Sequence, residues 1–402
     1  MPLRNSPYLP LLLAGVSTLA PFAIDTYLPA FHVLETALNA SPLQLQQTLS
    51  AYLFAFAIML LFHGALSDAY GRRKVVLVNL VLFSLASVGC ALSPNIHVFI
   101  LFRLLQGCSG GAGLVVGRAI IRDLHEGPAA QRVMSQVTLW FSLAPAIAPM
   151  IGGFLQANLG WKAIFWFMAA VGAVLFALCH PMLPETMPLE GRQVFRPRPL
   201  LRAYFQVLGD RRFLLLSLAM AANFSGFFLY IASAPAFVGT LLHQPETRYA
   251  WLFVPGIAGV SAGAWLSGRV ARHWHAVRTV QTGCAVMLLA AAVNLLGNFW
   301  HAPELPWAVI PIMVYTTGMA LVTPTLTLLM LEFFPAIRGM TASLQNFVAT
   351  MLNAVVAGLV SPVLSVSGVG LASGMAVLAV TGAGGIAAYY LLPLRRDIPQ
   401  SR

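Results

Sequence analysis

Two charged side chains stand inside otherwise apolar stretches: a carboxyl group that could bind a proton, and an arginine that could influence its pKa. Asp25 lies in PFAIDTYLPAF, residues 21–31, and Arg103 lies in LFRLLQG, residues 101–107. A charge in hydrocarbon costs at least ~2.5 kcal/mol, so both side chains should face protein or a water-filled cavity. Burial favours the protonated acid, whereas a nearby arginine favours the carboxylate. The pair therefore predicts a site for a coupling proton, and the alternative is a structural ion pair that only fixes helix packing.

A second set of chemically distinctive residues occurs in GALSDAYGRRKVVL, residues 64–77. We expect a small residue at Gly64 to permit close helix approach, and Gly71 to allow a tight loop. A simple basic loop would explain three bases but would not require the glycines or the carboxylate at these spacings. The residues of interest are Gly64, Asp68, Gly71, Arg72, Arg73 and Lys74.

The elements that must position these residues are long apolar stretches. The chain has 402 residues, of which 59% are hydrophobic and only 9% charged, a composition that indicates a polytopic membrane protein. A membrane-spanning helix needs roughly 20 apolar residues. The sequence therefore predicts an all-α integral membrane protein with twelve transmembrane helices, at 8–31, 46–67, 74–93, 96–120, 133–157, 161–182, 213–238, 249–270, 279–300, 306–331, 338–362 and 369–393.

These spans place Asp25 and Arg103 at similar depth. Asp25 follows Tyr8 by about 17 residues, or roughly 25 Å of helix. Arg103 follows Ile96 by about seven residues, or roughly 10 Å, on a span that runs the other way. In a hydrocarbon layer of about 30 Å both fall in the same half of the membrane. At this depth we expect both side chains to face protein or a water-filled cavity.

The basic residues indicate which side of the membrane each loop occupies. Lys162 and Arg248 lie in one set of alternate loops, whereas the other set holds most of the 23 Lys and Arg residues. By the positive-inside rule both termini are cytoplasmic, as expected for a bacterial inner-membrane protein. The net charge of +11 then reports orientation, and nucleic-acid binding is excluded. The basic set is Arg4; Arg72, Arg73, Lys74; Arg118, Arg122, Arg132; Arg192, Arg196, Arg198, Arg202, Arg211, Arg212; Arg269, Arg272, Arg278; Arg338; Arg395, Arg396 and Arg402.

The spans fall into two groups of six. We predict an N-terminal six-helix bundle at residues 1–183, a cytoplasmic linker rich in Pro and Arg at 184–212, and a C-terminal six-helix bundle at 213–402. HGALSDAYGRRK at 63–74 has a weak echo in AGAWLSGRVARH at 262–273, which favours duplication. Any helix end before a basic loop could produce the same echo.

The motifs resemble those of the major facilitator superfamily. Residues 64–77 meet every position of that family's motif A, G-x-L-x-D-x-x-G-R-[KR]-[KR]. Arg103, Gln106 and Gly107 are similar to its R-x-x-Q-G signature, motif B. The opening AIDTYLPAF and the later GRAIIRDL, residues 117–124, resemble the Bcr/CflA branch of drug/proton antiporters.

The segment LAPAIAPMIGGFL, residues 143–155, resembles motif C, the antiporter motif. Alanines replace two of the usual glycines, at Ala144 and Ala148. Prolines remove backbone hydrogen bonds and should bend this span. The resemblance implies that the bend seals the cavity against proton leak. The motif C residues are Pro145, Pro149, Gly152 and Gly153.

Candidate substrate-cavity residues are aromatic and amide side chains within the spans. Aromatic side chains suit apolar or cationic substrates, and amides in hydrocarbon seek partners or line cavities. For a single aromatic residue, lipid contact or packing is the competing explanation. The candidates are Tyr27, Tyr52, Phe56, Gln136, Trp140, Asn223, Phe224, Phe228, Gln345 and Asn346.

The resulting prediction is a proton-coupled multidrug antiporter that works by alternating access and exports small amphipathic molecules. Protons are its coupling ion, the lipid bilayer and the substrate are its partners, and no other cofactor or metal is expected. The family resemblance implies a monomer. One alternative is a proton-coupled uptake carrier, for instance for a nucleoside. A membrane enzyme is a remote third, because the spans carry no histidine cluster, carboxylate pair or nucleophile–base set.

Overall fold

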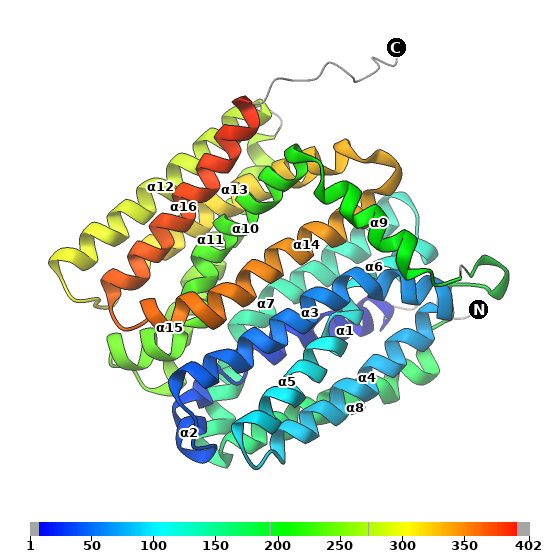
Figure 1. Ribbon diagram of the computed structural model, residues 1–402, viewed down its shortest axis with the longest axis horizontal. Helices are drawn as coiled ribbons and strands as arrows, with labels where there is room; N and C mark the ends of the chain where they lie inside the picture. Colours follow the sequence, from blue (N-terminus) through cyan, green and yellow to red (C-terminus); the bar gives the residue numbers. More distant parts are fainter. Residues whose placement is uncertain (1–7, 193, 272, 392–402) are drawn as a thin grey trace.

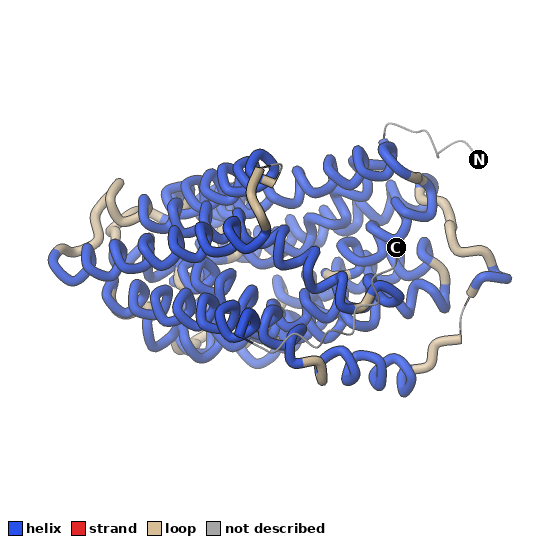
Figure 2. Tube along the Cα trace, turned by 90° about the horizontal axis from the view of Figure 1, so that it is seen from above, coloured by secondary structure: helices blue, strands red, loops and turns tan. Residues whose placement is uncertain are grey.

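A computed structural model describes residues 8–192, 194–271 and 273–391. The predicted inside charges Arg4, Arg272, Arg395, Arg396 and Arg402 lie outside this part of the chain, as do the extreme ends of both predicted bundles. Helices and short connections make up the described chain (Figure 2). Twelve of its segments are long and apolar enough to cross a membrane, which confirms the predicted fold class.

The first six spans occupy the residues up to Met182. The first contains a break between α1 and α2, and the fourth is divided into α5 and α6. The elements are α1 (Tyr8–Asp25), η1 (Leu28–Ala30), α2 (Phe31–Ala37), α3 (Pro42–Tyr70), α4 (Arg72–Ala91), α5 (Ile96–Gly110), α6 (Ala112–Leu124), α7 (Gly127–Leu159) and α8 (Trp161–Met182).

The remaining elements follow a connector that is itself partly helical. Two π-helical segments, η3 and η6, follow α10 and α14. The elements are η2 (Leu189–Gly191), α9 (Pro197–Leu208), α10 (Arg211–Ala232), η3 (Pro235–Leu241), η4 (Glu246–Arg248), α11 (Ala250–Val270), α12 (Ala276–Trp300), α13 (Ile310–Phe333), η5 (Pro335–Ile337), α14 (Arg338–Val355), η6 (Val356–Val360), α15 (Ser361–Leu364) and α16 (Gly368–Leu391).

Local sequence signals explain where several spans begin. The Ser41 hydroxyl accepts from Gln44 N while the Gln44 side chain accepts from Ser41 N, a capping box that starts α3 with Pro42 in its first turn. Asn95 caps α5 by accepting from Val98 N. Asp210 caps α10, so the last two residues of the predicted linker belong to a helix. These caps satisfy backbone donors that lack partners at a helix start.

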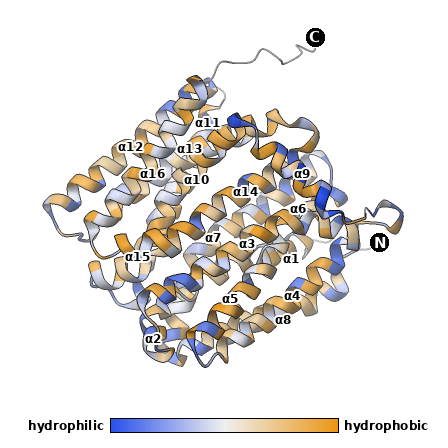
Figure 3. Cartoon of the chain, viewed as in Figure 1, coloured by the Kyte–Doolittle hydropathy of each residue, from blue (hydrophilic) through white to orange (hydrophobic). Residues whose placement is uncertain are grey.

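Neighbouring helices pack closely within each half of the chain. In the first half α3 packs on α5, α4 on α8 and α1 on α7; in the second, α10 packs on α16, and α13 on α11 and α12 (Figure 1). Contacts of α14 with α3, and of α11 with α7, join the halves. Most of the length of the helices is hydrophobic, whereas hydrophilic residues gather around α9 and also at the helix ends near α2 (Figure 3).

The helices end on two sides of the molecule. We call the side where α3 meets α4 at Gly71, and where α9 lies, the basic end. We call the side with η1, η4 and η6 the opposite end. The last span, α16, ends near the start of α10, because Phe333 contacts both Tyr389 of α16 and Arg212 of α10.

Candidate functional site

Asp25 is the last residue of α1, and the chain turns there before η1 begins. Its side chain is buried, with 3% of the residue exposed, and Oδ1 has no hydrogen-bond partner among the described residues. Gly152 of α7 lies so close to the Thr26 carbonyl that a Cβ at position 152 would overlap it. The break after Asp25 and the close approach of α7 therefore hold the acid in place.

A central cavity of about 340 Å³ lies between the two halves and is lined by α1, α3, α6, α7, α10, α13 and α14. Asp25 is the lining residue nearest the α1 terminus. Five of the predicted substrate residues line the same cavity: Phe56, Phe224, Phe228, Gln345 and Asn346. No basic side chain lies among the described lining residues. The cavity therefore offers aromatic faces, amides and one acid.

Arg103 reaches the level of Asp25 but lies on another side of α1. One guanidinium nitrogen, Nη1, donates to the Ala23 carbonyl at 3.0 Å and to Gln106 Oε1 at 2.5 Å. The guanidinium carbon lies 4.2 Å from the ring centre of Tyr27 and 4.5 Å from that of Tyr52. Arg103 is fully buried in this cage.

Asp25 and Arg103 form no ion pair in the described structure. The alternative of a structural Asp25–Arg103 ion pair is therefore wrong for this conformation. Asp25 lines the central cavity, whereas Arg103 does not line it and instead faces protein, in contact with Tyr27 and Tyr52. Depth along a helix could be estimated from the sequence, but the direction in which each side chain points depends on helix rotation.

The other five predicted substrate residues do not line the cavity. Tyr27 and Tyr52 enclose Arg103 instead. Asn223 is buried against Gly382 of α16, and its backbone carbonyl accepts from the Tyr315 hydroxyl at 2.9 Å. Gln136 and Trp140 are on an exposed side of α7.

The motif A residues connect α3, α4, α6 and the linker at the basic end. Arg72 pairs with Asp68, and its Nε donates to Asp123 Oδ2 of α6 at 3.2 Å. Its backbone N–H donates to Glu185 Oε1 at 2.8 Å. Arg73 NH2 donates to the His180 carbonyl at 2.5 Å, whereas Lys74 is exposed. Motif A thus fastens the first half of the chain to the start of the linker.

The two motif A glycines have different roles. Gly71 has φ of 100°, in the region that favours glycine, and this turn separates α3 from α4. At Gly64 a Cβ would meet Val115 at 3.7 Å, which is ordinary contact. The expected close helix approach at Gly64 is therefore wrong.

Motifs B and C position their neighbours by packing. Gln106 also donates to Ser87 Oγ at 2.8 Å, and a Cβ at Gly107 would overlap the Tyr52 carbonyl. In α7 the helix continues through Pro145 and Pro149, Pro145 lines the central cavity, and Gly153 is buried. The sealing role of a bend at these prolines stays a prediction.

Sequence reasoning missed a set of hydrogen bonds that join the halves at the opposite end. Gln46 Nε2 donates to the Ala232 carbonyl at 3.2 Å, Gln47 Nε2 to the Gly358 carbonyl at 2.8 Å, and Ser50 Oγ to the Ala354 carbonyl at 2.8 Å. We call these three donors the latch. The polar run QLQQTLS, residues 44–50, was the available signal, but its acceptors are backbone groups that a sequence does not reveal.

The basic end is hollow and partly covered by α9. A cavity of about 550 Å³ there is lined by α3, α4, α6, α14 and the linker. Tyr204 of α9 donates to the Leu61 carbonyl of α3 at 2.8 Å. Burial raises the pKa of Tyr204 to about 12, so the hydroxyl keeps its proton at neutral pH. Leu60 and Leu61 of α3 line the central and basic-end cavities respectively, so the two hollows adjoin.

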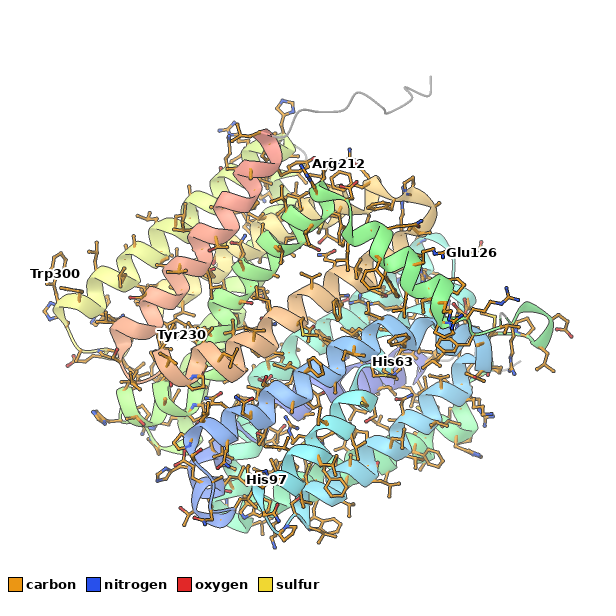
Figure 4. The ribbon with its side chains drawn as sticks, viewed as in Figure 1. His63, His97, Glu126, Arg212, Tyr230 and Trp300 are labelled. Atoms are coloured by element: carbon orange, nitrogen blue, oxygen red, sulfur yellow. The ribbon has the colours of Figure 1, made fainter. Side chains whose placement is uncertain are left out.

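Two labelled side chains mark polar packing away from the central cavity (Figure 4). His63 lies 3.2 Å from Asn79 Oδ1, between α3 and α4. Tyr230 accepts a hydrogen bond from Asn294 Nδ2 at 2.7 Å, between α10 and α12. Neither residue lines the cavity, so these contacts serve packing within each half.

Twelve spans around a cavity that holds one buried acid define a multi-pass membrane carrier. The family model of the Major Facilitator Superfamily matches residues 13–358. The chain belongs to this superfamily of transporters, which confirms the resemblance seen in its motifs.

Relatives include transporters named for drug resistance. The chain is 33% identical over 390 residues to the uncharacterized MFS-type transporter YdgK of Bacillus subtilis, whose name carries no drug, covering 96% of this chain and 95% of that protein. It is 27% identical to multidrug resistance protein D of Escherichia coli, over 87% of each chain. It is 28% identical to a chloramphenicol resistance protein of Pseudomonas aeruginosa, over 77% of this chain and 73% of that protein.

Solved structures share the fold. A bacterial homologue of the human lysosomal transporter Spinster, inward-facing and occupied, has a TM-score of 0.72 at 16% identity, covering 97% of each chain. The inward open xylose transporter XylE of Escherichia coli has a TM-score of 0.72 at 15% identity, covering 95% of this chain and 96% of that one.

Proposed function

We propose that this protein is a proton-coupled exporter of small amphipathic molecules. The observation that carries the proposal is Asp25, a buried carboxyl group with an unpartnered oxygen in a cavity between the two halves. An unpaired charge inside the membrane costs free energy. The unpartnered Asp25 carboxyl group is therefore suited to exchange a proton for a substrate. The drug-resistance names of relatives support export over the uptake alternative.

The exchange follows from opposite effects of proton and substrate. When the basic end is open, a substrate bound beside Asp25 favours the ionised group, and the proton leaves toward the cytoplasm. After the halves rock, protons from outside bind Asp25 again and the substrate is released. Each ligand shifts the equilibrium only through its different affinity for the two states.

The lining of the cavity defines the substrate class. Its volume of about 340 Å³ lies within the range of small-molecule pockets. Aromatic residues such as Phe224 and Phe228 offer apolar area and cation–π contact, and Gln345 and Asn346 offer hydrogen bonds. With one acid and no base among the described lining residues, the site suits neutral molecules or monovalent cations and disfavours anions.

The membrane arrangement completes the proposal. The basic end faces the cytoplasm of a bacterial inner membrane, since Arg and Lys residues gather there. Both termini are then cytoplasmic, protons are the sole coupling ion, and the protein acts as a monomer.

A growth-inhibition panel tests the function. Cells that express the intact chain should tolerate some amphipathic toxic compounds, and Asp25→Asn should remove that protection at equal protein level. Acidified inverted vesicles then give the direction, because substrate-induced proton release indicates antiport and proton co-movement indicates symport. Full proton-coupled transport by Asp25→Asn would refute the role of Asp25.

A further inference from the structure

The central cavity has two chemically different walls. Among the lining residues from the first half, Asp25 alone is polar, and the others are apolar, as at Phe56 and Phe141. The second half contributes six neutral polar side chains to the described lining: Ser217, Thr323, Gln345, Asn346, Thr350 and Asn353. Burying polar groups costs free energy unless they are hydrogen-bonded, so a purely hydrocarbon guest would fit this wall poorly. The second-half wall therefore indicates a substrate that forms hydrogen bonds there.

Asn353 of α14 is the member of this wall whose amide orientation is fixed by a neighbour. The buried Ser225 hydroxyl of α10 donates to Asn353 Oδ1 at 2.8 Å. Asn353 Nδ2 has no hydrogen-bond partner among the described residues. Because its oxygen is occupied, the Asn353 side chain offers the cavity N–H donors. These donors require an acceptor atom on the substrate, since a buried donor without a partner costs free energy.

Asn353 lies at the closed end of the cavity, at about the depth of Asp25. It follows Arg338, at the start of α14 on the basic end, by about 15 residues, or roughly 22 Å of helix. Asp25 follows Tyr8 by roughly 25 Å. The carbonyl of the next residue, Ala354, accepts one hydrogen bond of the latch at 2.8 Å. The acid of one half and the amide of the other therefore lie at one level, next to the latch.

We propose that Asn353 is a specificity-determining residue and that the exported molecules are vicinal amino alcohols and their ethers. The ammonium group of the substrate lies at Asp25, and the oxygen on the neighbouring carbon accepts from Asn353 Nδ2. The apolar body lies against Phe224 and Phe228, which line the same cavity. Ser225 is a positioning residue, because it acts through Asn353. This inference rests on the proposed export function and names the substrate class more narrowly.

Three probes that differ at one oxygen test this assignment by binding alone. The first is an isopropylaminoethanol with a naphthyl ring on the hydroxyl-bearing carbon; the second replaces its hydroxyl by methoxy, and the third replaces it by hydrogen. Equilibrium binding of the tritiated amines is measured on the full-length protein in lipid nanodiscs, with empty nanodiscs as the blank. The hydroxyl and methoxy probes should bind with similar Kd, because both carry an acceptor. The deoxy probe should bind about tenfold more weakly, because it leaves Asn353 Nδ2 unpaired.

Two variants assign the preference to the hydrogen-bonded pair. Asn353→Leu removes the donors and should bring the three Kd values within about twofold of one another. Ser225→Ala frees the amide to turn its oxygen toward the cavity and should reduce the preference to about threefold. The matched controls are Asn294→Leu and Ser233→Ala, which remove buried, hydrogen-bonded side chains outside the cavity and should keep the full preference. A ratio of Kd values does not depend on the folded fraction, so partial unfolding cannot imitate its loss.

Four results would overturn the assignment. Equal Kd values on the unaltered chain would show that the oxygen is not recognised, and this comparison needs no variant that could misfold. Binding of the hydroxyl probe alone would mean that the substrate donates instead of accepting. A preference that persists in Asn353→Leu would place the oxygen at another side chain. Failure of all three probes to bind would exclude this substrate class, while Asp25-dependent protection in the growth panel would leave the export function standing. Conversely, oxygen-selective binding without any protection would refute the export function alone.

Discussion

Arg103 shows how a buried charge can be held without an opposite charge. Two aromatic rings, one backbone carbonyl and one amide surround its guanidinium group, and Nε and NH2 have no described hydrogen-bond partner. Cation–π contact with Tyr27 and Tyr52 replaces part of the lost hydration. This leaves Asp25 free of Arg103 in this conformation, which the exchange of proton for substrate requires.

Replacing Arg103 by Lys tests the cage. An ammonium group keeps the charge but cannot stack between two rings or hold Gln106 with a planar fork, so we expect a stability loss of about 1–3 kcal/mol. Thermal unfolding of the purified protein in detergent measures it. Arg269→Lys is the control, because Arg269 packs on Trp265, which is 65% exposed. Equal losses in both variants would contradict the cage.

Gly152 makes a second residue-level prediction. A Cβ at this position would overlap the Thr26 carbonyl, next to Asp25, so Gly152→Ala should push α7 away from the α1 break. Overpacking of this kind costs about 1–3 kcal/mol, and we expect strongly reduced drug protection as well as a lower melting temperature. Gly268→Ala on α11 is the control, because a Cβ there meets nothing within 4 Å. Undiminished protection in Gly152→Ala would show that this contact is dispensable.

At the scale of elements, the latch closes the opposite end by joining α3 to α10, α14 and η6. Each hydrogen bond stabilises the closed opposite end by about 0.5–1.5 kcal/mol. Removing one therefore shifts the equilibrium roughly fivefold toward the state in which that end is open. Gln47→Ala with Ser50→Ala should therefore widen the opposite end. Spin labels replace His32 and Val366, which are both strongly exposed, in a cysteine-free background. Double electron–electron resonance then measures the distance between the two labels across the opposite end.

Thr381→Ala is the control for the latch, because the Thr381 hydroxyl bonds only the Val377 carbonyl of its own helix at 2.8 Å. The distance distribution should shift to longer values in the latch variant and stay unchanged in Thr381→Ala. A distribution that is unaltered in both would mean that packing alone keeps the opposite end closed.

The linker helix α9 is fixed to α3 by the Tyr204 hydroxyl. Tyr204→Phe should weaken this docking by about 1 kcal/mol and raise amide exchange in α9 roughly fivefold. Tyr70→Phe, at an exposed tyrosine, should change nothing. Burial raises the pKa of Tyr204 from 10.0 to about 12, so its contribution is complete below pH 10 and is lost as the pH rises toward 12. Exchange in α9 that responded to Tyr204 ionisation between pH 6 and 9 would contradict this docking.

The same elements show what the sequence could and could not predict. Span positions follow from the length that hydrocarbon imposes, so all twelve were found. Phe224 and Gln345 line the cavity as expected, whereas Trp140 does not, because packing with neighbours decides which face of a helix turns inward. The Pro- and Arg-rich composition of the linker did not predict helix α9. The prolines at 197 and 199 lie in its first turn, where proline is tolerated.

At the scale of the whole molecule, closure at one end and hollows at the other create a carrier with one described buried carboxylate. Asp25 is the only Asp or Glu among the buried residues of the described chain. Under the proposed alternating access, the two halves carry at most one proton on a carboxylate in each cycle. The coupling ratio is therefore expected to be one proton per substrate.

This ratio predicts how transport responds to voltage. Exchange of one proton for a neutral substrate moves one net charge, whereas exchange for a monovalent cation moves none. In proteoliposomes with a fixed pH gradient, a potassium–valinomycin potential should change accumulation of a neutral substrate about tenfold per 60 mV, from ~2.3 kcal/mol per charge per 100 mV. A monovalent cation should show no response. If cation accumulation follows the potential, a further proton-carrying group takes part, and the single-site assignment to Asp25 fails.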